Sequence, residues 1–135
     1  MDFVSIRIIT ADIARLVDFY ERVTDSKANC STPEFAEIRT SHGVLAIAST
    51  RTVALFAPDQ PDTARPAENR SVIIEFLVDD VDAVRDKLTG IVVDFVYEPT
   101  TMPWGNRSLL FRDPDGNLVN FFTPVTQAAI DKFAR

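Results

Sequence analysis

The hydrophobic pattern of the first half of the chain changes from strand-like to helical and back. Apolar and polar side chains alternate over residues 4–9, where β-branched residues are frequent, and this predicts a strand. Apolar residues then recur at helical spacing, which predicts a capped amphipathic helix over 12–23. Residues 35–39 and 44–48 are predicted strands, and Ser41-His42-Gly43 is the predicted turn between them.

A proline-rich segment divides the chain near its midpoint, and the pattern repeats after it. Residues 57–70 hold three prolines and almost no apolar side chains, which is typical of a loop or linker. Residues 113–117, Asp-Pro-Asp-Gly-Asn, predict a turn because proline presets φ and glycine accepts a positive φ. The other elements predicted in this half are strands at 71–78, 92–96, 108–111 and 118–122, a helix running from Asp79 or Asp80 to Leu88, and a terminal helix within 126–135.

The two halves align at an offset of 68 residues (80 minus 12), which places Asp12 on Asp80. Apolar residues of the two first strands then coincide, and we expect them to pack under the helices: Val4 with Val72, Ile6 with Ile74 and Ile8 with Phe76. The intervening residues must face the other side of the sheet, because strand side chains alternate. These are Ser5 with Ile73, Arg7 with Glu75 and Ile9 with Leu77.

Each half therefore predicts a β-α-β-β-β module. We expect an α+β fold in which two such modules form a curved mixed sheet, with helices outside and a concave ligand cavity inside. A ferredoxin-like sandwich also repeats strands and helices, but it has fewer strands in each half. The expected division of the single domain 1–135 is a first module at about 1–56, a linker at 57–70, a second module at about 71–123 and a C-terminal helix at 124–135.

Composition narrows the classes of partner. The 135 residues fit one domain, and the 46% hydrophobic and 25% charged fractions are ordinary for a globular protein. The net charge of -6 argues against nucleic acid and anionic membranes, and it permits a cationic ligand. No apolar stretch approaches the ~20 residues that span a bilayer, and the N-terminus lacks a signal-peptide pattern, so we expect a cytoplasmic protein.

The reactive residue types are scarce. One cysteine excludes an intrachain disulfide, and one histidine excludes a multi-histidine metal site within one chain. We interpret His42 as a solvated turn residue rather than a catalytic base, and Cys30 as unreactive because no basic neighbour lowers its pKa. The sequence contains no recognisable Ser-His-Asp set, phosphate loop or dinucleotide fingerprint.

Several segments carry a family resemblance through their order and spacing. They are Ile8 to Ile13 with Val17 to Tyr20, Phe76 to Val84, Pro103-Trp104-Gly105-Asn106-Arg107, and Phe111-Arg112-Asp113-Pro114-Asp115-Gly116-Asn117-Leu118. Together they resemble the vicinal-oxygen-chelate superfamily of glyoxalases, bleomycin-resistance proteins and dioxygenases. The similarity extends from about Val4 to about Thr123 and is greatest to the bleomycin-resistance branch.

The resemblance also locates the positions of the family's metal ligands. Its enzymes bind a divalent metal on the concave face through His, Glu or Gln from the first and last strand of each module. These positions correspond to Ser5, Ile73 and Asn120, and to Ile47 when Gly43 is aligned with Gly116. Isoleucine has no lone pair and neutral oxygens bind divalent metals weakly, so we expect no metal and no cofactor. A displaced site would have to use Glu37, Glu75 and His42.

Ligand contacts are instead predicted for residues expected near the concave face. Trp104 stacks on a planar ligand or plugs a module edge, and Arg107 binds an anionic group or pairs with Glu98. Arg7 and Glu75 anchor a ligand or form a structural ion pair. The full predicted set is Arg7, Glu75, Tyr97, Met102, Trp104, Arg107, Asn120 and Phe122, of which the aromatic residues and Met102 could equally be core.

The family resemblance, together with the replacement of the family's metal-binding residues, favours a metal-independent protein that binds and sequesters a small molecule, as in antibiotic resistance. The acidic balance suits a cationic or aromatic ligand, and we expect a homodimer because a half-barrel leaves strand edges open. The alternative is a divalent-metal-dependent glyoxalase-type lyase or isomerase, or an extradiol-type dioxygenase, with a displaced metal site. A third possibility is a protein whose family function is lost or regulatory.

Overall fold

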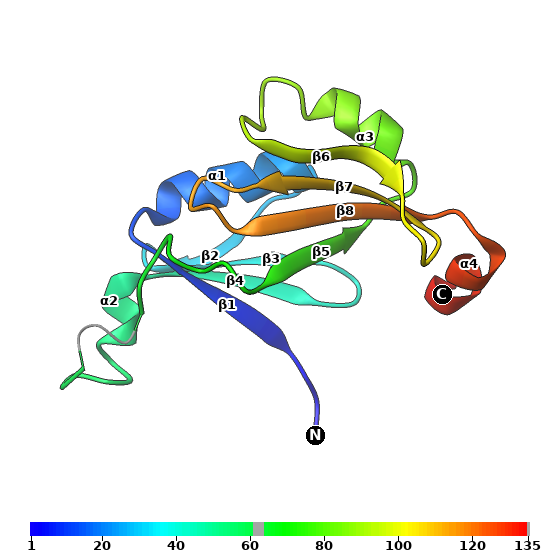
Figure 1. Cartoon of the computed structure of the whole chain (residues 1–135). Helices are drawn as coiled ribbons and strands as arrows, with labels where there is room; N and C mark the ends of the chain where they lie inside the picture. The colour runs from blue at the N-terminus through cyan, green and yellow to red at the C-terminus, as the bar shows by residue number, and fades with distance from the viewer. Residues whose placement is uncertain (61–63, 135) are drawn as a thin grey trace. The chain divides into compact units, whose positions relative to one another are not determined.

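The computed structural model describes residues 1–60 and 64–134 and divides into two compact units, Met1–Asn69 and Arg70–Arg135. Each unit is a β-α-β-β-β module with its own four-stranded mixed sheet (Figure 1). The α+β repeat predicted from the sequence is therefore confirmed. Every helix of the described residues is too short or too polar to cross a lipid bilayer.

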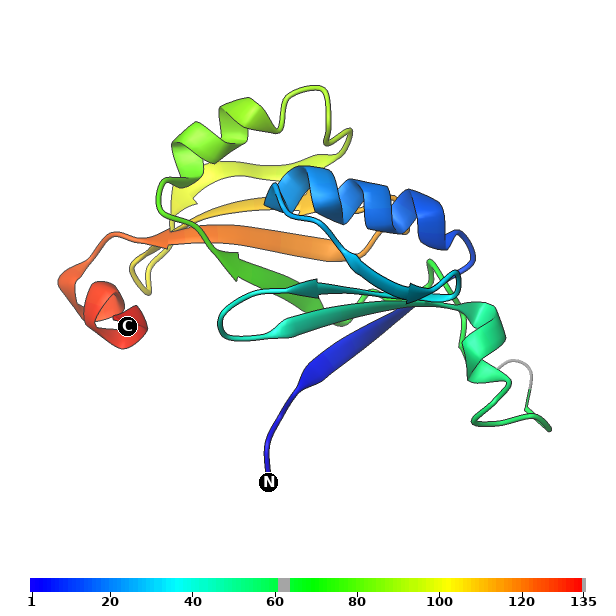
Figure 2. The ribbon, with the colours of Figure 1, turned by 180° about the vertical axis from the view of Figure 1, so that it is seen from behind.

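The first unit carries the strand order β1-β4-β3-β2, with β1 parallel to β4 and the other pairs antiparallel. Helix α1 contacts β3 and β4, and Figure 2 shows it lying along one face of this sheet. The elements are β1 (Ser5–Thr10), α1 (Ile13–Thr24), β2 (Asn29–Thr32), β3 (Phe35–Arg39), β4 (Val44–Ser49) and the short helix α2 (Thr50–Val53).

Helix α1 starts and ends where its sequence provides caps. The Asp12 carboxylate accepts a hydrogen bond from the Arg15 backbone N–H at 3.1 Å, which satisfies a free donor of the first turn. Asp25 adopts the left-handed conformation after the last turn. The buried residues recur at helical spacing and face the sheet: Leu16, Phe19, Tyr20 and Val23.

The second unit repeats this plan with the strand order β5-β8-β7-β6, in which β5 is parallel to β8. Helix α3 contacts β6, β7 and β8, and the Asp80 carboxylate caps it by accepting from the Ala83 N–H at 3.1 Å. The elements are β5 (Ile73–Leu77), α3 (Val81–Lys87), β6 (Phe95–Thr101), β7 (Asn106–Arg112), β8 (Leu118–Pro124) and α4 (Gln127–Phe133).

The core of the second unit lies between α3 and the sheet. Phe111 and Phe121 are buried with ring centroids 5.0 Å apart in an edge-to-face contact. Leu109 and Val119 are also fully buried, and they lie on the same face of β7 and β8 as Phe111 and Phe121. Odd-numbered side chains of both strands contact α3, because Arg107 donates to Asp82 and the Thr123 hydroxyl accepts from the Val81 N–H. The odd-numbered residues of β7 and β8 therefore face the side that packs on α3.

Several expectations about the elements need correction. Strand β2, Asn-Cys-Ser-Thr, was not predicted because it is polar and lacks alternation. The strand predicted at 92–96 is β6, which begins later and ends at Thr101. The short helix α2 was also not predicted, and the part of the predicted linker at 61–63 lies outside the described residues.

The first-strand residues expected under the helices are not all covered. Ile6 is 47% exposed, and Val4 and Val72 are also exposed. The reason is that β1 and β5 lie at the edge of their sheets, whereas α1 packs on β3 and β4 and α3 packs on β6, β7 and β8. Phe76 does reach the core, with its ring centroid 5.4 Å from that of Phe121.

Candidate functional site

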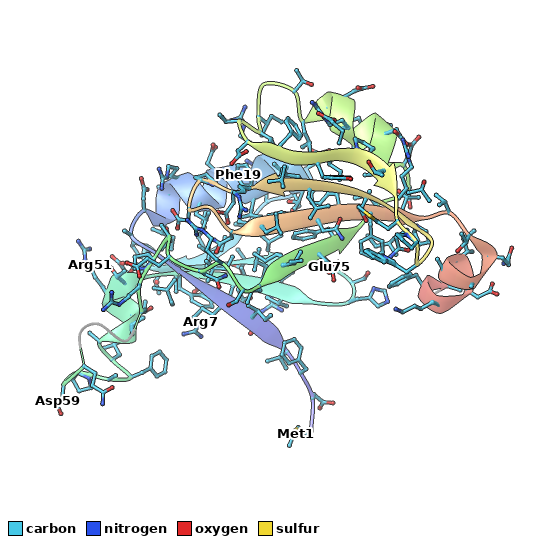
Figure 3. All side chains as sticks on the ribbon, in the orientation of Figure 1. Met1, Arg7, Phe19, Arg51, Asp59 and Glu75 are labelled. Atoms are coloured by element: carbon cyan, nitrogen blue, oxygen red, sulfur yellow. The ribbon has the colours of Figure 1, made fainter. Side chains whose placement is uncertain are left out.

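The side of the second sheet that faces away from α3 gathers four of the eight predicted ligand residues, Glu75, Tyr97, Asn120 and Phe122. Glu75 pairs with Asn120 between β5 and β8, and Asn120 pairs with Leu110 between β8 and β7. Side chains of directly paired residues share a face, so all three lie on the side opposite Phe111. Ser108 follows on the same face by alternation. We call this side, with Glu75, Ser108, Leu110 and Asn120, the acceptor face; Figure 3 labels Glu75 on it.

Glu75 and Asn120 are joined by a side-chain hydrogen bond. The Asn120 amide nitrogen donates to the Glu75 carboxylate at 2.8 Å. This contact fixes the orientation of the amide, because an amide oxygen facing a carboxylate oxygen would be repelled. Asn120 is only 8% exposed, and its Oδ1 has no hydrogen-bond partner. The pair therefore presents a carboxylate with an unpartnered carbonyl acceptor beside it.

Two further buried polar groups lie on the same side of β7 and were missed by sequence reasoning. Ser108 is 2% exposed, and its hydroxyl has no hydrogen-bond partner. The Asn106 Oδ1 is also buried without a partner. Folded proteins leave few buried polar groups unpaired, so such a group calls for a water, an ion or a ligand. The recurrence of polar residues at alternate positions of a strand was the signal available in the sequence.

Aromatic residues border the acceptor face. Phe122 is buried on it and packs against Phe133 of α4, with ring centroids 5.0 Å apart. Tyr97, which is 52% exposed, pairs with Leu110 across β6 and β7. These two residues thus lie on the acceptor face, and their contact with a ligand stays a prediction.

Trp104 lies in the turn between β6 and β7, and its side chain is 67% exposed. The turn is tight, because the Gly105 N–H donates to the Met102 carbonyl at 2.9 Å and Gly105 has a φ of +95°. A Cβ on Gly105 would lie 2.0 Å from the Thr126 hydroxyl, so glycine is required there. The exposed tryptophan is available for stacking on a ligand, and this role stays a prediction.

Arg107 lies on the other side of the sheet. It is an odd-numbered residue of β7, and its guanidinium donates two hydrogen bonds, at 2.7 and 2.9 Å, to Asp82 of α3. The expected ion partner, Glu98, is instead paired with Arg85, at 2.6 and 2.9 Å. The prediction of a Glu98 partner was wrong because alternation along β7 directs Arg107 towards α3.

The Arg107 pair predicts a pH dependence of stability. The hydrogen bond from Arg107 lowers the pKa of Asp82 below its usual value of 3.8. A carboxylate whose pKa is lowered by folding adds to the free energy of unfolding above its unfolded-state pKa. This stabilisation is lost as the pH falls through the folded-state pKa. Asp82→Asn should therefore flatten the dependence of unfolding free energy on pH below about pH 4, as measured by urea denaturation at successive pH values. The control Asp79→Asn keeps the Arg107 contact, and a slope equal to that of Asp82→Asn would contradict the assignment.

Of the two remaining predicted residues, Met102 is half-buried directly after β6, and Arg7 belongs to the first unit (Figure 3). Its guanidinium carbon lies 5.0 Å from the ring centroid of Phe35 and 5.7 Å from that of Phe56. Both contacts fall within the range of a cation–π interaction. The two phenylalanines were not predicted as its neighbours, since one lies on β3 and the other follows α2.

The assignment of Ile47 to a metal-ligand position is corrected by the strand register. Ile47 pairs with Ile8 and is fully buried on the side that packs on α1. Arg7 pairs with Ala46, as its repeat mate Glu75 pairs with Asn120. The first-unit counterpart of Asn120 is therefore Ala46, whose methyl side chain cannot bind a metal either.

The donor set at these positions does not fit a divalent metal. The side chains of Ile73 and Ala46 offer no donor atom, and those of Ser5 and Asn120 offer only neutral oxygen atoms. Two of the three candidates for a displaced site are engaged elsewhere, because Glu37 pairs with Arg39 and the His42 ring bonds Ser41 at 2.6 Å in an exposed turn. Within residues 1–60 and 64–134, no three His, Cys, Asp or Glu side chains gather in a way that could hold a metal.

A family model places the chain among known proteins. The model of the Glyoxalase/Bleomycin resistance protein/Dioxygenase superfamily matches residues 2–121. The chain belongs to this superfamily. The match confirms the resemblance at the level of the superfamily and does not single out the bleomycin-resistance branch. A search of curated proteins found no match.

Solved structures agree with the family assignment. A glyoxalase/bleomycin resistance protein/dioxygenase family enzyme from Burkholderia phytofirmans PsJN is 18% identical with a TM-score of 0.80, over 93% of this chain and 100% of that one. A glyoxalase/bleomycin resistance protein/dioxygenase from Nocardioides is 19% identical with a TM-score of 0.76, over 94% and 85% of the two chains. A glyoxalase-related enzyme from Fulvimarina pelagi is 16% identical with a TM-score of 0.74, over 90% and 87%. At these identities the likeness establishes the fold alone.

Proposed function

We propose that this superfamily member binds a small molecule, a drug or a metabolite, without a metal ion and holds it by stoichiometric capture. The observation that carries the proposal is the chemistry of the ligand positions. Ser5, Ile73 and Asn120 replace the His, Glu or Gln that a divalent site requires. At Asn120 the atom left for a metal is Oδ1, a neutral oxygen, because the amide nitrogen donates to Glu75.

The acceptor face supports a binding role. Specific binding sites combine apolar and aromatic walls with a few polar groups that orient the ligand. Here Ile73, Leu110 and Tyr97 border the Glu75–Asn120 pair, and Trp104 is exposed in the neighbouring turn of the same unit. These features favour an aromatic or cationic ligand.

A homodimer is part of the proposal. In the residues that the structure describes, β1 hydrogen-bonds only to β4, and β5 only to β8, so each first strand leaves one edge open. Exposed apolar side chains lie on these strands, among them Ile6 and Ile73, and the exposed Phe3 lies two residues before β1. Open apolar edges invite pairing with another chain, and a second copy would cover them. The cytoplasmic location and the absence of a nucleic-acid partner stay predictions from composition.

The proposal predicts ligand binding that survives chelation. After dialysis against EDTA, titration with a panel of cationic and aromatic antibiotics should give saturable quenching of Trp104 fluorescence for at least one compound. Calorimetry should give the same affinity with and without EDTA. Trp104→Ala should weaken the binding of a stacking ligand by about 1–3 kcal/mol, whereas Trp104→Phe should retain most of the affinity.

The competing enzyme hypothesis predicts the opposite result. It requires stoichiometric Zn, Ni, Mn or Fe in the purified protein and an activity that EDTA abolishes and the metal restores. That outcome, together with an absence of saturable binding by the chelated protein, would overturn the proposal.

A further inference from the structure

We infer that the acceptor face recognises a planar organic cation of the amidinium or guanidinium type, with the Glu75 carboxylate as its anchor. This inference rests on the proposed binding function and names the chemical class of its ligand. It is carried by two independent observations. One is a carboxylate without a cationic partner, and the other is the buried Asn120 Oδ1 beside it, which lacks a hydrogen-bond donor.

The first observation is the position of Glu75 among the charges of its unit. Glu98, the other carboxylate on the strands of this sheet, is paired with Arg85, and Asp82 of α3 is paired with Arg107. Across the described residues, the only hydrogen bond or ion pair of the Glu75 side chain is the one from the neutral Asn120 amide. Arg112 is the cation on the same side of β7, and its guanidinium donates to the Gly116 carbonyl at 3.0 Å. Glu75 is therefore an exposed anion held in place by a neutral group.

The second observation is the chemistry of the unpartnered atoms. Asn120 Oδ1 and Asn106 Oδ1 can only accept hydrogen bonds, and the Ser108 hydroxyl can accept one. All three lie on the acceptor face, but only Asn120 is next to Glu75, because Ser108 is paired with Phe122 and Asn106 with Pro124 further along β8. The Asn120 Oδ1 beside the carboxylate disfavours an anion, whereas a ligand with several N–H donors would bind both groups. One carboxylate with neutral oxygens is too weak a set for a divalent metal, so the donors belong to an organic cation.

The geometry favours a planar cation over a simple ammonium ion. Asn120 donates to one carboxylate oxygen, Oε2, and this contact fixes the orientation of the Glu75 carboxylate. Amidinium and guanidinium groups present parallel N–H bonds that match a carboxylate edge, and this pairing is about twice as strong as a neutral hydrogen bond. Asn120 acts here as a positioning residue, and Glu75 makes the contact with the ligand.

Benzamidine and its neutral isostere benzamide test the inference directly. Both are titrated into the 15N-labelled full-length protein, and affinities are read from chemical-shift changes in the NMR spectrum, including the side-chain amide of Asn120. We expect saturable binding of benzamidine that moves the Asn120 side-chain signal, and at least tenfold weaker binding of benzamide. Glu75→Gln should weaken benzamidine about tenfold and leave benzamide unchanged, because it removes the charge and keeps the shape.

A matched variant controls for the general effect of charge. Glu98→Gln removes one carboxylate from the same sheet and changes the net charge equally, yet it should leave benzamidine affinity within about twofold. Equal binding of benzamidine and benzamide, equal loss in Glu75→Gln and Glu98→Gln, or no binding of benzamidine would each overturn the inference. If panel compounds without a cationic group bind wild type and Glu75→Gln equally, the cation subsite is overturned and the proposed binding function stands.

Discussion

Replacement of Phe111 by alanine should lower the free energy of unfolding of the second unit by about 3–5 kcal/mol. Phe111 is fully buried, and its ring packs edge-to-face on Phe121 and lies 6.3 Å from the ring centroid of Phe95. Truncation removes the apolar surface of the ring and leaves a space between the sheet and α3. Because the interior of a folded unit is closely packed, the surroundings of such a space relax only partly.

Guanidinium denaturation followed by Trp104 fluorescence would measure this loss, since the only tryptophan reports on the second unit. Phe111→Leu should cost less, about 1–2 kcal/mol, because it retains most of the apolar volume. Leu110→Ala is the control on the opposite face of the same strand, and its half-buried side chain should cost about 1–2 kcal/mol. A loss for Phe111→Ala no larger than that for Leu110→Ala would refute the assignment of the core to the α3 side.

The repeat was predictable because it depends only on periodicity. The offset that places Asp12 on Asp80 is set by two capped helices that follow two alternating strands, and both aspartates do cap their helices. Alternation then correctly placed Glu75 on the face away from α3. The offset could not reveal that β1 and β5 are edge strands, because edge position depends on strand order and not on local pattern.

The residues of the candidate site could be predicted only where the alignment of the two halves gave the correct strand register. Aligning the turns at Gly43 and Gly116 gave Ile47, one residue from the true counterpart Ala46. The two hairpin loops differ by one residue, spanning 40–43 between paired residues 39 and 44 and 113–117 between paired residues 112 and 118. A shift of one residue moves a strand side chain to the opposite face. The alignment from the helix caps avoided this error because no loop intervenes.

The sequence alone could not predict which side chains of different helices and strands contact each other. Arg107 meets Asp82, 25 positions earlier, and Asn120 meets Glu75, 45 positions earlier. Such pairs depend on the packing of α3 and on the parallel pairing of β5 with β8. The unpartnered oxygen atoms on the acceptor face likewise could not be predicted, because identifying them requires the positions of all neighbouring hydrogen-bond donors.

Asp113→Ala should destabilise the second unit by about 2–4 kcal/mol, because Asp113 organises the hairpin that aligns β7 with β8. Its buried carboxylate accepts from the backbone N–H groups of Asp115 and Asn117, both at 2.9 Å, and from the Asn117 side-chain amide at 2.8 Å. Removal of the carboxylate leaves these donors buried without partners, which costs more than the loss of an exposed contact. Asp113→Asn retains one accepting oxygen and should cost about 1 kcal/mol.

The same hairpin also connects stability to binding. It sets the register in which Leu110 lies opposite Asn120, and therefore which side of β8 presents Asn120 to Glu75. Loosening the hairpin should broaden the NMR signals of β7 and β8 near the turn and weaken benzamidine binding, even at concentrations of denaturant where the unit remains folded. Backbone proton contacts between Leu110 and Asn120, measured in Asp113→Ala, would show whether the register persists. Full retention of both stability and benzamidine affinity would mean that the turn follows from strand pairing and does not determine it.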